Sequence, residues 1–252
     1  IAEKNKVNLE FEASVCGGVP IIRSLKESLI ANKISKIYGI MNGTSNYILS
    51  SMDKQNKNFK EVLSNATKLG YAETNPSADL NGNDVSAKLK ILSSLCFNSF
   101  LSDNIYVEGI KEIDTIDINN ANKLGYKIKL LGFAELLNNK IYQRVHPTLI
   151  KKNSYVASID GVLNAVIIDG KPVRQRTSHG EGAGPSATTS ALISDISSIL
   201  RGNIKFPFSI SSKKRKKLKF KTIDERLFSA YLRFEVVDKP GVLSNITNIF
   251  SK

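Results

Sequence analysis

The sequence has no long hydrophobic run and only two cysteines among its 252 residues. A membrane-spanning helix needs about 20 consecutive apolar residues, and no stretch approaches that length. Residues 1–10 mix charged and polar side chains, so we expect no signal peptide. Cys16 and Cys96 lack metal-type spacing and suit a reduced compartment. These absences predict a cytoplasmic protein that does not have a membrane among its partners.

The sequence also lacks the fingerprint of a dinucleotide-binding unit. No Gly-x-Gly-x-x-Gly follows a strand and opens a helix. Near the other end, residues 227–252 show the pattern of one strand and one helix, which is too little to bury a core. We therefore expect both ends of the chain to be breaks in a longer protein.

The net charge of +13 is concentrated in one segment. Residues 213–221 contain seven lysines and arginines and no acid, so the rest of the chain carries +6, the difference between +13 and seven. A block of like charges is typical of a solvated linker, which is the interpretation that we favour. The alternative is a surface that binds nucleic acid or a membrane.

Hydrophobic spacing predicts alternating strands and helices in the first half of the chain. Residues Leu9–Val15 alternate as in a strand, and Pro20 suits the first turn of a helix that extends to about residue 32. A strand is expected over Ile34–Met41, with Thr44 or Ser45 capping the next helix. Two more helices are expected, one from Phe59 to Leu69 with Gly70 past its end, and one from about Asp84 to Phe97.

After residue 105 the pattern turns to strands. The expected elements are the pair Tyr126–Ala134 and Lys140–Val145 around Asn138-Asn139, the pair Val162–Ile168 and Lys171–Gln175 around Asp169-Gly170, and a helix over Pro185–Leu200. The interpretation is an α/β (α+β) fold, in which helices pack on one face of a mixed, largely antiparallel sheet.

Charged side chains gather around the start of the helix expected from residue 84. Its apolar face is formed by Val85, Leu89, Leu92 and Cys96. At 100° per residue, Asp84 and Lys88 lie about 40° apart at the edge of that face. A lysine there can be partly buried and still open to a cleft, as a proton-transfer group requires. The alternative is an ion pair on the helix surface.

This region resembles the signature of the homoserine dehydrogenase family. The resemblance rests on Ala66, Gly70-Tyr71-Ala72, Asn75-Pro76, Asp79-Leu80, Gly82, Asp84 and Lys88, and on the segments 12–22, 39–49, 88–92, 145–149 and 180–184. It spans about residues 9–202. It implies a substrate-binding and dimerisation domain over residues 1–210, a basic linker over 211–226, and a truncated, ferredoxin-like ACT domain over 227–252.

The resemblance implies an oxidoreductase that interconverts L-homoserine and L-aspartate 4-semialdehyde with NAD or NADP, in threonine, methionine and isoleucine biosynthesis. Lys88 would be the general base that takes the hydroxyl proton of homoserine, and Asp84 would hold that lysine. The implied substrate-binding residues are Glu73, Asp79, Tyr71, Thr44 and Gly43.

The resemblance also implies a cofactor contact and a cation site. Gly182, in a glycine-rich loop that leads into a helix, would contact the cofactor, although a plain turn is the alternative. The family binds its cofactor mostly through an N-terminal Rossmann domain, so we expect this fragment alone to be inactive. Sodium or another monovalent cation would lie at Glu12, Val15, Gly17 and Val19, since oxygen ligands suit a hard cation; a glycine-rich turn without an ion is the alternative.

Two functions from other classes stay open. One is an inactive or regulatory remnant that forms a homodimer without turnover. The other is a basic module that binds nucleic acid through residues 213–221. A homodimer is the assembly that the resemblance implies, and we do not expect nucleic acid among the partners.

Overall fold

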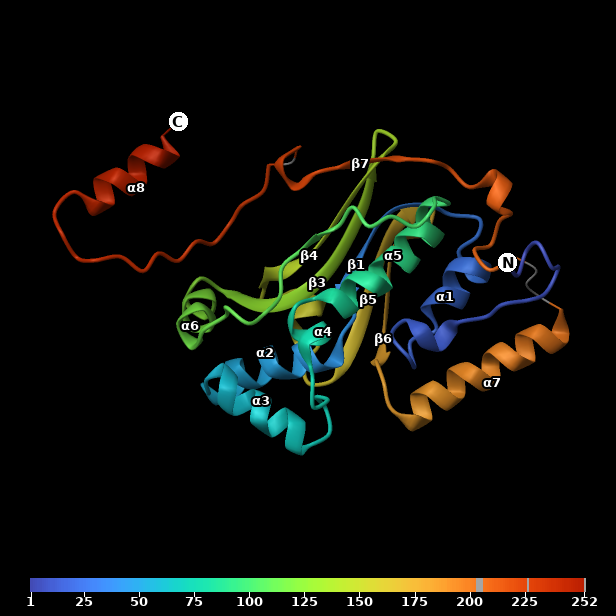
Figure 1. The fold of residues 1–252 in the computed structure, drawn as a ribbon, viewed down its shortest axis with the longest axis horizontal. Helices are drawn as coiled ribbons and strands as arrows, with labels where there is room; N and C mark the ends of the chain where they lie inside the picture. Colours follow the sequence, from blue (N-terminus) through green and yellow to red (C-terminus); the bar gives the residue numbers. More distant parts are fainter. Residues whose placement is uncertain (203–205, 226, 252) are drawn as a thin grey trace.

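A single mixed sheet organises the computed structural model, which describes residues 1–202, 206–225 and 227–251 (Figure 1). The strand order is β2-β4-β3-β1-β5-β6, and β7 also pairs with β4. Neighbours are antiparallel except for β2 and β7, which run parallel to β4. The strands are β1 (Lys33–Ile40), β2 (Tyr106–Val107), β3 (Tyr126–Leu137), β4 (Lys140–Lys151), β5 (Leu163–Lys171), β6 (Arg174–Glu181) and β7 (Lys219–Lys221). The predicted mixed, largely antiparallel sheet is confirmed.

Helices cover one face of this sheet, and the main core lies between them and the strands (Figure 1). The helices are α1 (Ile21–Arg23), α2 (Gly43–Gln55), α3 (Phe59–Lys68), α4 (Ser77–Leu80), α5 (Asn83–Phe97), α6 (Thr115–Lys123), α7 (Pro185–Arg201) and α8 (Val242–Phe250). The apolar face predicted for α5 is confirmed, since Val85, Leu89 and Leu92 are fully buried. A smaller apolar cluster lies on the other face of the sheet, beside the short helix η3 (Tyr155–Ser158).

The two predicted hairpins form, but one turn lies elsewhere. Asn138 and Asn139 join β3 to β4 with positive φ angles of 49° and 60°, the conformation that a two-residue hairpin turn requires. The second turn lies at residues 172–173, so its placement at Asp169-Gly170 was wrong. Asp169 instead pairs with Lys36 of β1, and their side chains form an ion pair of 2.5 Å, which keeps β5 extended past the predicted turn.

The strand predicted over Leu9–Val15 was also wrong. This segment forms only the short 3-10 helix η1 (Glu12–Ser14). The carboxylate of Glu12 accepts hydrogen bonds from the backbone N–H groups of Ile22 and Arg23 at the start of the next helix, at 2.8 and 2.7 Å. The side chain of Glu12 thus points inward and accepts from backbone N–H groups that have no partner within their own helix. The backbone at Glu12 therefore turns and does not continue as an extended strand.

Local capping signals explain two further differences. The cap of α2 is Asn42, whose side chain accepts from the N–H of Ser45, so the assignment to Thr44 or Ser45 was wrong by two or three residues. Helix α6 was not predicted. It begins with a capping box. The side chain of Asp114 accepts from the backbone N–H of Asp117, and the side chain of Asp117 accepts from the backbone N–H of Asp114.

Most basic side chains of residues 213–221 are exposed to solvent, as expected, but Arg215 is not. Arg215 donates to the carbonyl of Ser99 at 3.0 and 2.7 Å, and its guanidinium lies over the rings of Phe100 and Phe208. Residues 219–221 form strand β7 beside β4. The segment therefore packs on the domain, while the boundaries proposed at residues 210 and 226 stay predictions.

The C-terminal segment contacts α6, where Tyr231 and Arg233 bind Asp117, and then leads to α8, which lies apart from the sheet (Figure 1). Residues 227–239 form no strand, so the strand expected there is not confirmed. A strand needs a neighbour for its backbone hydrogen bonds, and the described part of the chain offers none at this place. The ACT-like assignment of residues 227–252 remains a prediction.

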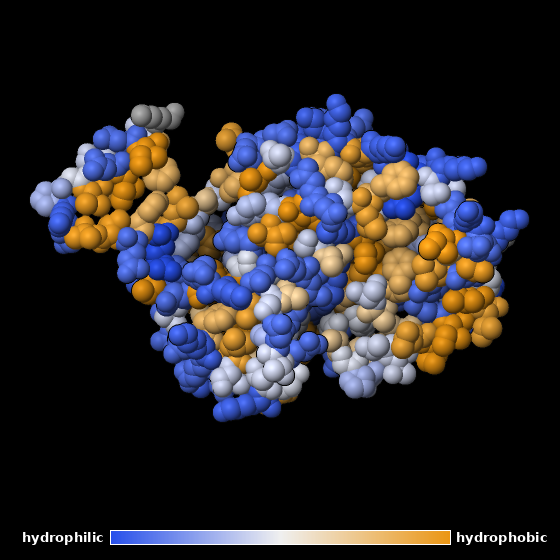
Figure 2. All heavy atoms as spheres, viewed as in Figure 1, coloured by the Kyte–Doolittle hydropathy of each residue, from blue (hydrophilic) through white to orange (hydrophobic). Residues whose placement is uncertain are grey.

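Apolar side chains gather on the surface over α7 and over the C-terminal segment (Figure 2). The inward face of α7 carries small or polar residues, whereas its outward face carries large apolar ones: Leu192, Ile193, Ile196, Ile199 and Leu200. Exposed apolar patches of this kind mark interaction surfaces. No described helix is both long enough and apolar enough to cross a membrane.

Candidate functional site

Lys88 lies at the junction of α5 and the end of β1. Its ammonium group forms an ion pair of 2.7 Å with Oδ2 of Asp84, one helical turn earlier. It also donates a hydrogen bond of 2.9 Å to the carbonyl of Met41, the residue after β1. Only 17% of the Lys88 side chain is exposed. The pair therefore joins two elements and is more than a surface ion pair.

Asn42 links this pair to Asp79. Its Nδ2 donates to Oδ1 of Asp79 at 2.7 Å and to Oδ2 of Asp84 at 2.9 Å, while its Oδ1 caps α2. The side chain is almost completely buried, which fixes the three contacts in one geometry. The structure thus brings together three of the predicted site residues, Asp79, Asp84 and Lys88, through Asn42, which lies in the same turn as the predicted residues Gly43 and Thr44. The family resemblance implies that this turn lines the pocket, and the preference of asparagine for helix N-caps agrees with its position before α2.

The other predicted substrate residues are Thr44, Tyr71, Gly43 and Glu73, of which the first three contact other parts of the fold whereas Glu73 is exposed. The hydroxyl of Thr44 donates to the carbonyl of Tyr71 at 2.6 Å, so these two residues meet as expected. Gly43 packs so closely on the carbonyl of Val162 that an added Cβ would lie 2.8 Å from its oxygen. Glu73 is exposed and has no hydrogen bond or ion pair with any residue that the structure describes. Its carboxylate is therefore free to bind a ligand.

Two glycine-rich segments, around Gly17 and around Gly182, pack against each other. A Cβ added to Gly17 would lie 2.7 Å from the carbonyl oxygen of Gly182, and the N–H of Gly18 donates to the carbonyl of Glu181 at 2.9 Å. Gly184, by contrast, has open space around its Cβ position, and α7 begins directly after it. The exposed loop and the free N–H groups at the start of α7 fit an anionic or nicotinamide ligand.

Cys16 shows that the first glycine-rich turn lies close to Lys88. Burial raises the pKa of the Cys16 thiol to about 11, and the charge of Lys88 is the strongest effect that opposes this rise. Lys88 and Asp84 therefore lie within electrostatic range of Cys16, and the turn at residues 16–19 that holds this thiol contacts the loop around Gly182. Cys16 and Cys96 are both buried free thiols.

The predicted cation site would have to rely on backbone oxygens, of which those of Glu12 and Val19 also accept N–H groups from Val15 and Ile21. Both carboxylate oxygens of Glu12 already accept N–H groups, as described above, and burial raises the pKa of Glu12 in spite of these bonds. Among the described residues, no group of three or more His, Cys, Asp or Glu could hold a metal. A cation here would therefore depend on the carbonyls of Glu12, Val15, Gly17 and Val19. An oxygen-only set fits a hard monovalent cation.

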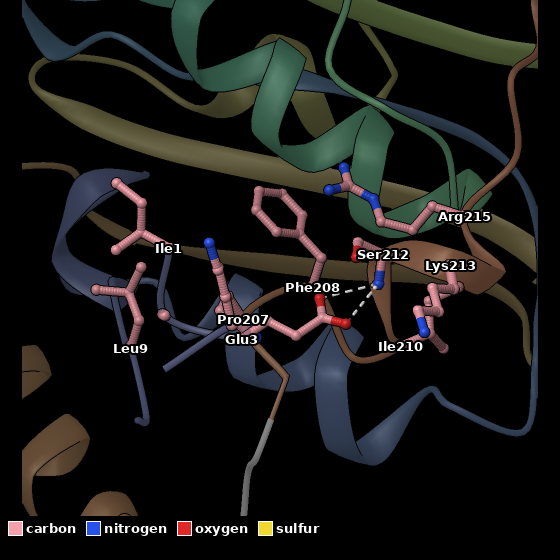
Figure 3. A pocket seen from close by; sticks show the side chains of 11 residues that line it. Ile1, Glu3, Leu9, Pro207, Phe208, Ile210, Ser212, Lys213 and Arg215 are labelled. Carbon is pink, nitrogen blue, oxygen red and sulfur yellow. Dashed lines mark hydrogen bonds between the residues drawn. The ribbon is translucent and has the colours of Figure 1, made fainter. Parts of the chain in front are cut away.

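A cavity of about 580 Å³ lies away from this cluster, between the N-terminal segment and residues 207–215 (Figure 3). The carboxylate of Glu3 on its wall accepts from the hydroxyl of Ser211 at 2.6 Å and from the N–H of Ser212 at 2.9 Å. This carboxylate is occupied within the fold, and no residue of the Lys88 cluster lines the cavity. The converging polar groups around Lys88 are therefore the better candidate site.

Comparisons with known proteins agree with one another. The sequence profile of the family described as "Homoserine dehydrogenase" matches residues 20–197. The chain is 41% identical over its full length to a homoserine dehydrogenase of Neisseria gonorrhoeae, of which it covers 60%. It superposes on the crystal structure of a homoserine dehydrogenase from Thiobacillus denitrificans with a TM-score of 0.85 and 37% identity, over 96% of this chain and 57% of that one.

A third relative was solved with a bound cofactor. This hyperthermophilic archaeal homoserine dehydrogenase mutant, in complex with NADPH, gives a TM-score of 0.67 at 26% identity, over 78% of this chain and 56% of that one. The chain thus spans little more than half of the length of the relatives that it matches.

Proposed function

This chain belongs to the homoserine dehydrogenase family, and on that premise we propose that it provides the substrate-binding and proton-transfer part of an enzyme that interconverts L-homoserine and L-aspartate 4-semialdehyde. The observation that carries the proposal is the junction of Lys88, Asp84 and Asp79 through Asn42. This arrangement holds one amine beside two carboxylates at the edge of a helix, with 17% of the Lys88 side chain and 29% of the Asp84 side chain exposed. It supports a site in which a proton is moved and a charged ligand is oriented.

In the proposed oxidation, Lys88 takes the proton of the substrate hydroxyl. The ammonium ion that forms is stabilised by Oδ2 of Asp84 and by the carbonyl of Met41, its two partners in the structure. These partners use two of its three N–H bonds, which leaves the third for the substrate oxygen. A bound nicotinamide cofactor supplies the acceptor for the hydride that leaves the same carbon. In the reverse direction the ammonium returns its proton to the alkoxide.

We assign substrate binding to two sets of groups with opposite charge. The carboxylates of Asp79 and Glu73 would bind the substrate ammonium. The first N–H groups of α2, at Gly43 and Thr44, would receive the substrate carboxylate, because a helix N-terminus attracts anions. Tyr71 would shield this contact from water. The affinity for so small a zwitterion must come from charge pairing, because little area is buried.

We propose NAD or NADP as the cofactor, with the loop around Gly182 as the contact that this chain provides. The exposed start of α7 supports this assignment, as does the NADPH bound to one relative. A monovalent cation, with sodium as the first candidate, would brace the turn of residues 15–19 through its carbonyls. A homodimer, a cytoplasmic location and a role in threonine, methionine and isoleucine biosynthesis complete the proposal.

The direct test is to supply homoserine with NADP or NAD and to follow the absorbance of the reduced cofactor. We expect turnover by the dehydrogenase as the organism makes it, and little or none by residues 1–252 alone. A Lys88→Met variant gives the background rate. If the whole protein reduces neither cofactor and yet forms a dimer, the inactive remnant replaces the proposed enzyme. Retention on nucleic acid that depends on salt and on residues 213–221 would favour the binding module.

A further inference from the structure

Asn164, near the start of β5, is fully buried with an unpaired amide. Its relative exposure is 0%, and neither Nδ2 nor Oδ1 has a hydrogen-bond partner within the described residues. It lies on the helix-covered face of the sheet, together with Val166 and Ile168, which belong to the main core. A buried amide without partners costs stability, and an apolar side chain of similar size would not. Stability therefore does not explain asparagine at this position.

The amide of Asn164 occupies the place where a side chain on Gly182 would lie. A Cβ added to Gly182 would come within 2.3–2.4 Å of Cγ, Nδ2 and Oδ1 of Asn164. The φ angle of Gly182 lies outside the left-handed region, so its backbone conformation would accept other residues. The requirement for glycine at position 182 thus comes from the neighbouring amide.

Gly182 is held on its other side by Gly17, whose Cβ position lies 2.7 Å from the Gly182 carbonyl oxygen. The Asn164 amide also lies near enough to the Cys16 thiol to oppose the rise in its pKa, although the two groups do not have hydrogen-bond geometry. Lys88 acts on the same thiol. The layer formed by Asn164, Gly182 and Gly17 therefore adjoins Cys16, a thiol that lies within electrostatic range of Lys88.

We propose that Asn164 is a positioning residue, which sets the place of Gly182 and so the contact of this chain with the nicotinamide cofactor. The inference rests on the proposed function and extends it to a residue that touches neither substrate nor cofactor. The planar amide of Asn164 packs against the Cα of Gly182 and so limits how closely the loop can approach β5. Without this amide, the loop around Gly182 can move toward β5 and change its position relative to Lys88.

A double-mutant cycle tests the contact independently of activity. Thermal midpoints are measured for the unchanged protein, Asn164→Ala, Gly182→Ala and the double variant. We expect Gly182→Ala to lower the midpoint, and Asn164→Ala to relieve that loss because it empties the space that the new methyl group needs. Gly109→Ala is the matched control. Its new methyl group would meet the backbone of Leu80 and Asn81, which does not contact Asn164, so Asn164→Ala should not relieve its loss of stability. Additive effects in the cycle would overturn the contact.

The same proteins then test the positioning role, in the dehydrogenase as the organism makes it. We expect Gly182→Ala to weaken NADPH binding, measured by nucleotide fluorescence, by about tenfold, and the double variant to recover most of that loss. The KM for homoserine should change much less than the KM for the cofactor. Equal NADPH affinity in all four proteins would overturn the positioning role. Tight NADPH binding without homoserine turnover would instead refute the proposed function.

Discussion

The side chain of Asn42 donates a hydrogen bond of 2.9 Å to Oδ2 of Asp84, the same oxygen that forms the ion pair with Lys88. A carboxylate oxygen that receives both an amide and an ammonium is held in one orientation. Lys88 is therefore directed by a residue on a different element, 46 positions away in the chain.

The shared oxygen predicts different outcomes for two substitutions of Asn42. Both Asn42→Ser and Asn42→Ala remove the bridge to Asp79 and Asp84, and both should lower kcat by at least about tenfold, because Lys88 loses its orientation. Serine still caps α2, whereas alanine does not and should cost about 1 kcal/mol of stability. Steady-state kinetics and urea unfolding separate the two effects. A serine variant with unchanged kcat would show that the bridge does not position Lys88.

Replacement of Lys88 should abolish most turnover and leave the fold intact. We expect Lys88→Met to lower kcat by about 10²–10⁴-fold, the usual contribution of a positioned proton-transfer group. Circular dichroism and the thermal midpoint should stay close to those of the unchanged protein. Lys90→Met is the control, because Lys90 lies on the same helix and pairs with the exposed Asp103. Equal losses in the two variants would argue against a special role of Lys88.

Glu73→Gln should raise the KM for homoserine by about tenfold with a smaller change in kcat, because it removes one charge pair with the substrate ammonium. Glu73 is exposed and unpaired within the described residues, so the Glu73→Gln variant should be as stable as the unchanged protein. The kinetic constants are compared with those of Glu61→Gln, which removes an exposed carboxylate on α3. A homoserine KM that stays at the original value would remove Glu73 from the binding site.

Asp160 should make stability depend on acid pH. Burial alone would raise its pKa, but hydrogen bonds from Lys129 and Lys54 lower the pKa of Asp160 to about 2, from an ordinary value of 3.8. Since the folded value is the lower one, ionised Asp160 stabilises the fold above about pH 4, and this contribution is lost as the pH falls toward 2. Urea unfolding of the original protein and of Asp160→Asn should give a difference that is constant above pH 4 and shrinks below it. A difference that does not vary with pH would refute this assignment.

Arg215 should be the one basic side chain of residues 213–221 whose loss destabilises the domain clearly. It binds the Ser99 carbonyl and lies over two aromatic rings, so Arg215→Ala should cost about 1–2 kcal/mol. Lys214→Ala, at an exposed position, should cost little. Denaturant unfolding measures both. If both substitutions changed the free energy of unfolding by the same small amount, residues 213–221 would be a solvated linker throughout.

Several features could be predicted because they depend on neighbours along the chain. The apolar spacing of Val85, Leu89 and Leu92 placed α5, and with it the i,i+4 pair of Asp84 and Lys88. The turn at Asn138-Asn139 depended on two residues that tolerate positive φ. Residues within one turn of each other meet whenever the helix or hairpin forms, so the local pattern is sufficient.

The contacts that make the site depended on packing between distant segments. Asn42 reaches Asp79 and Asp84 across 37 and 42 residues, and only the folded chain shows that one amide serves both carboxylates. The same holds for Glu12, whose carboxylate caps a helix although its segment has a strand-like pattern, and for Arg215, which binds the carbonyl of Ser99 across 116 residues. Local periodicity determined the elements of this protein. The tertiary structure decided which polar groups meet, because a buried polar group takes whichever partner the packing of distant segments brings within hydrogen-bond distance.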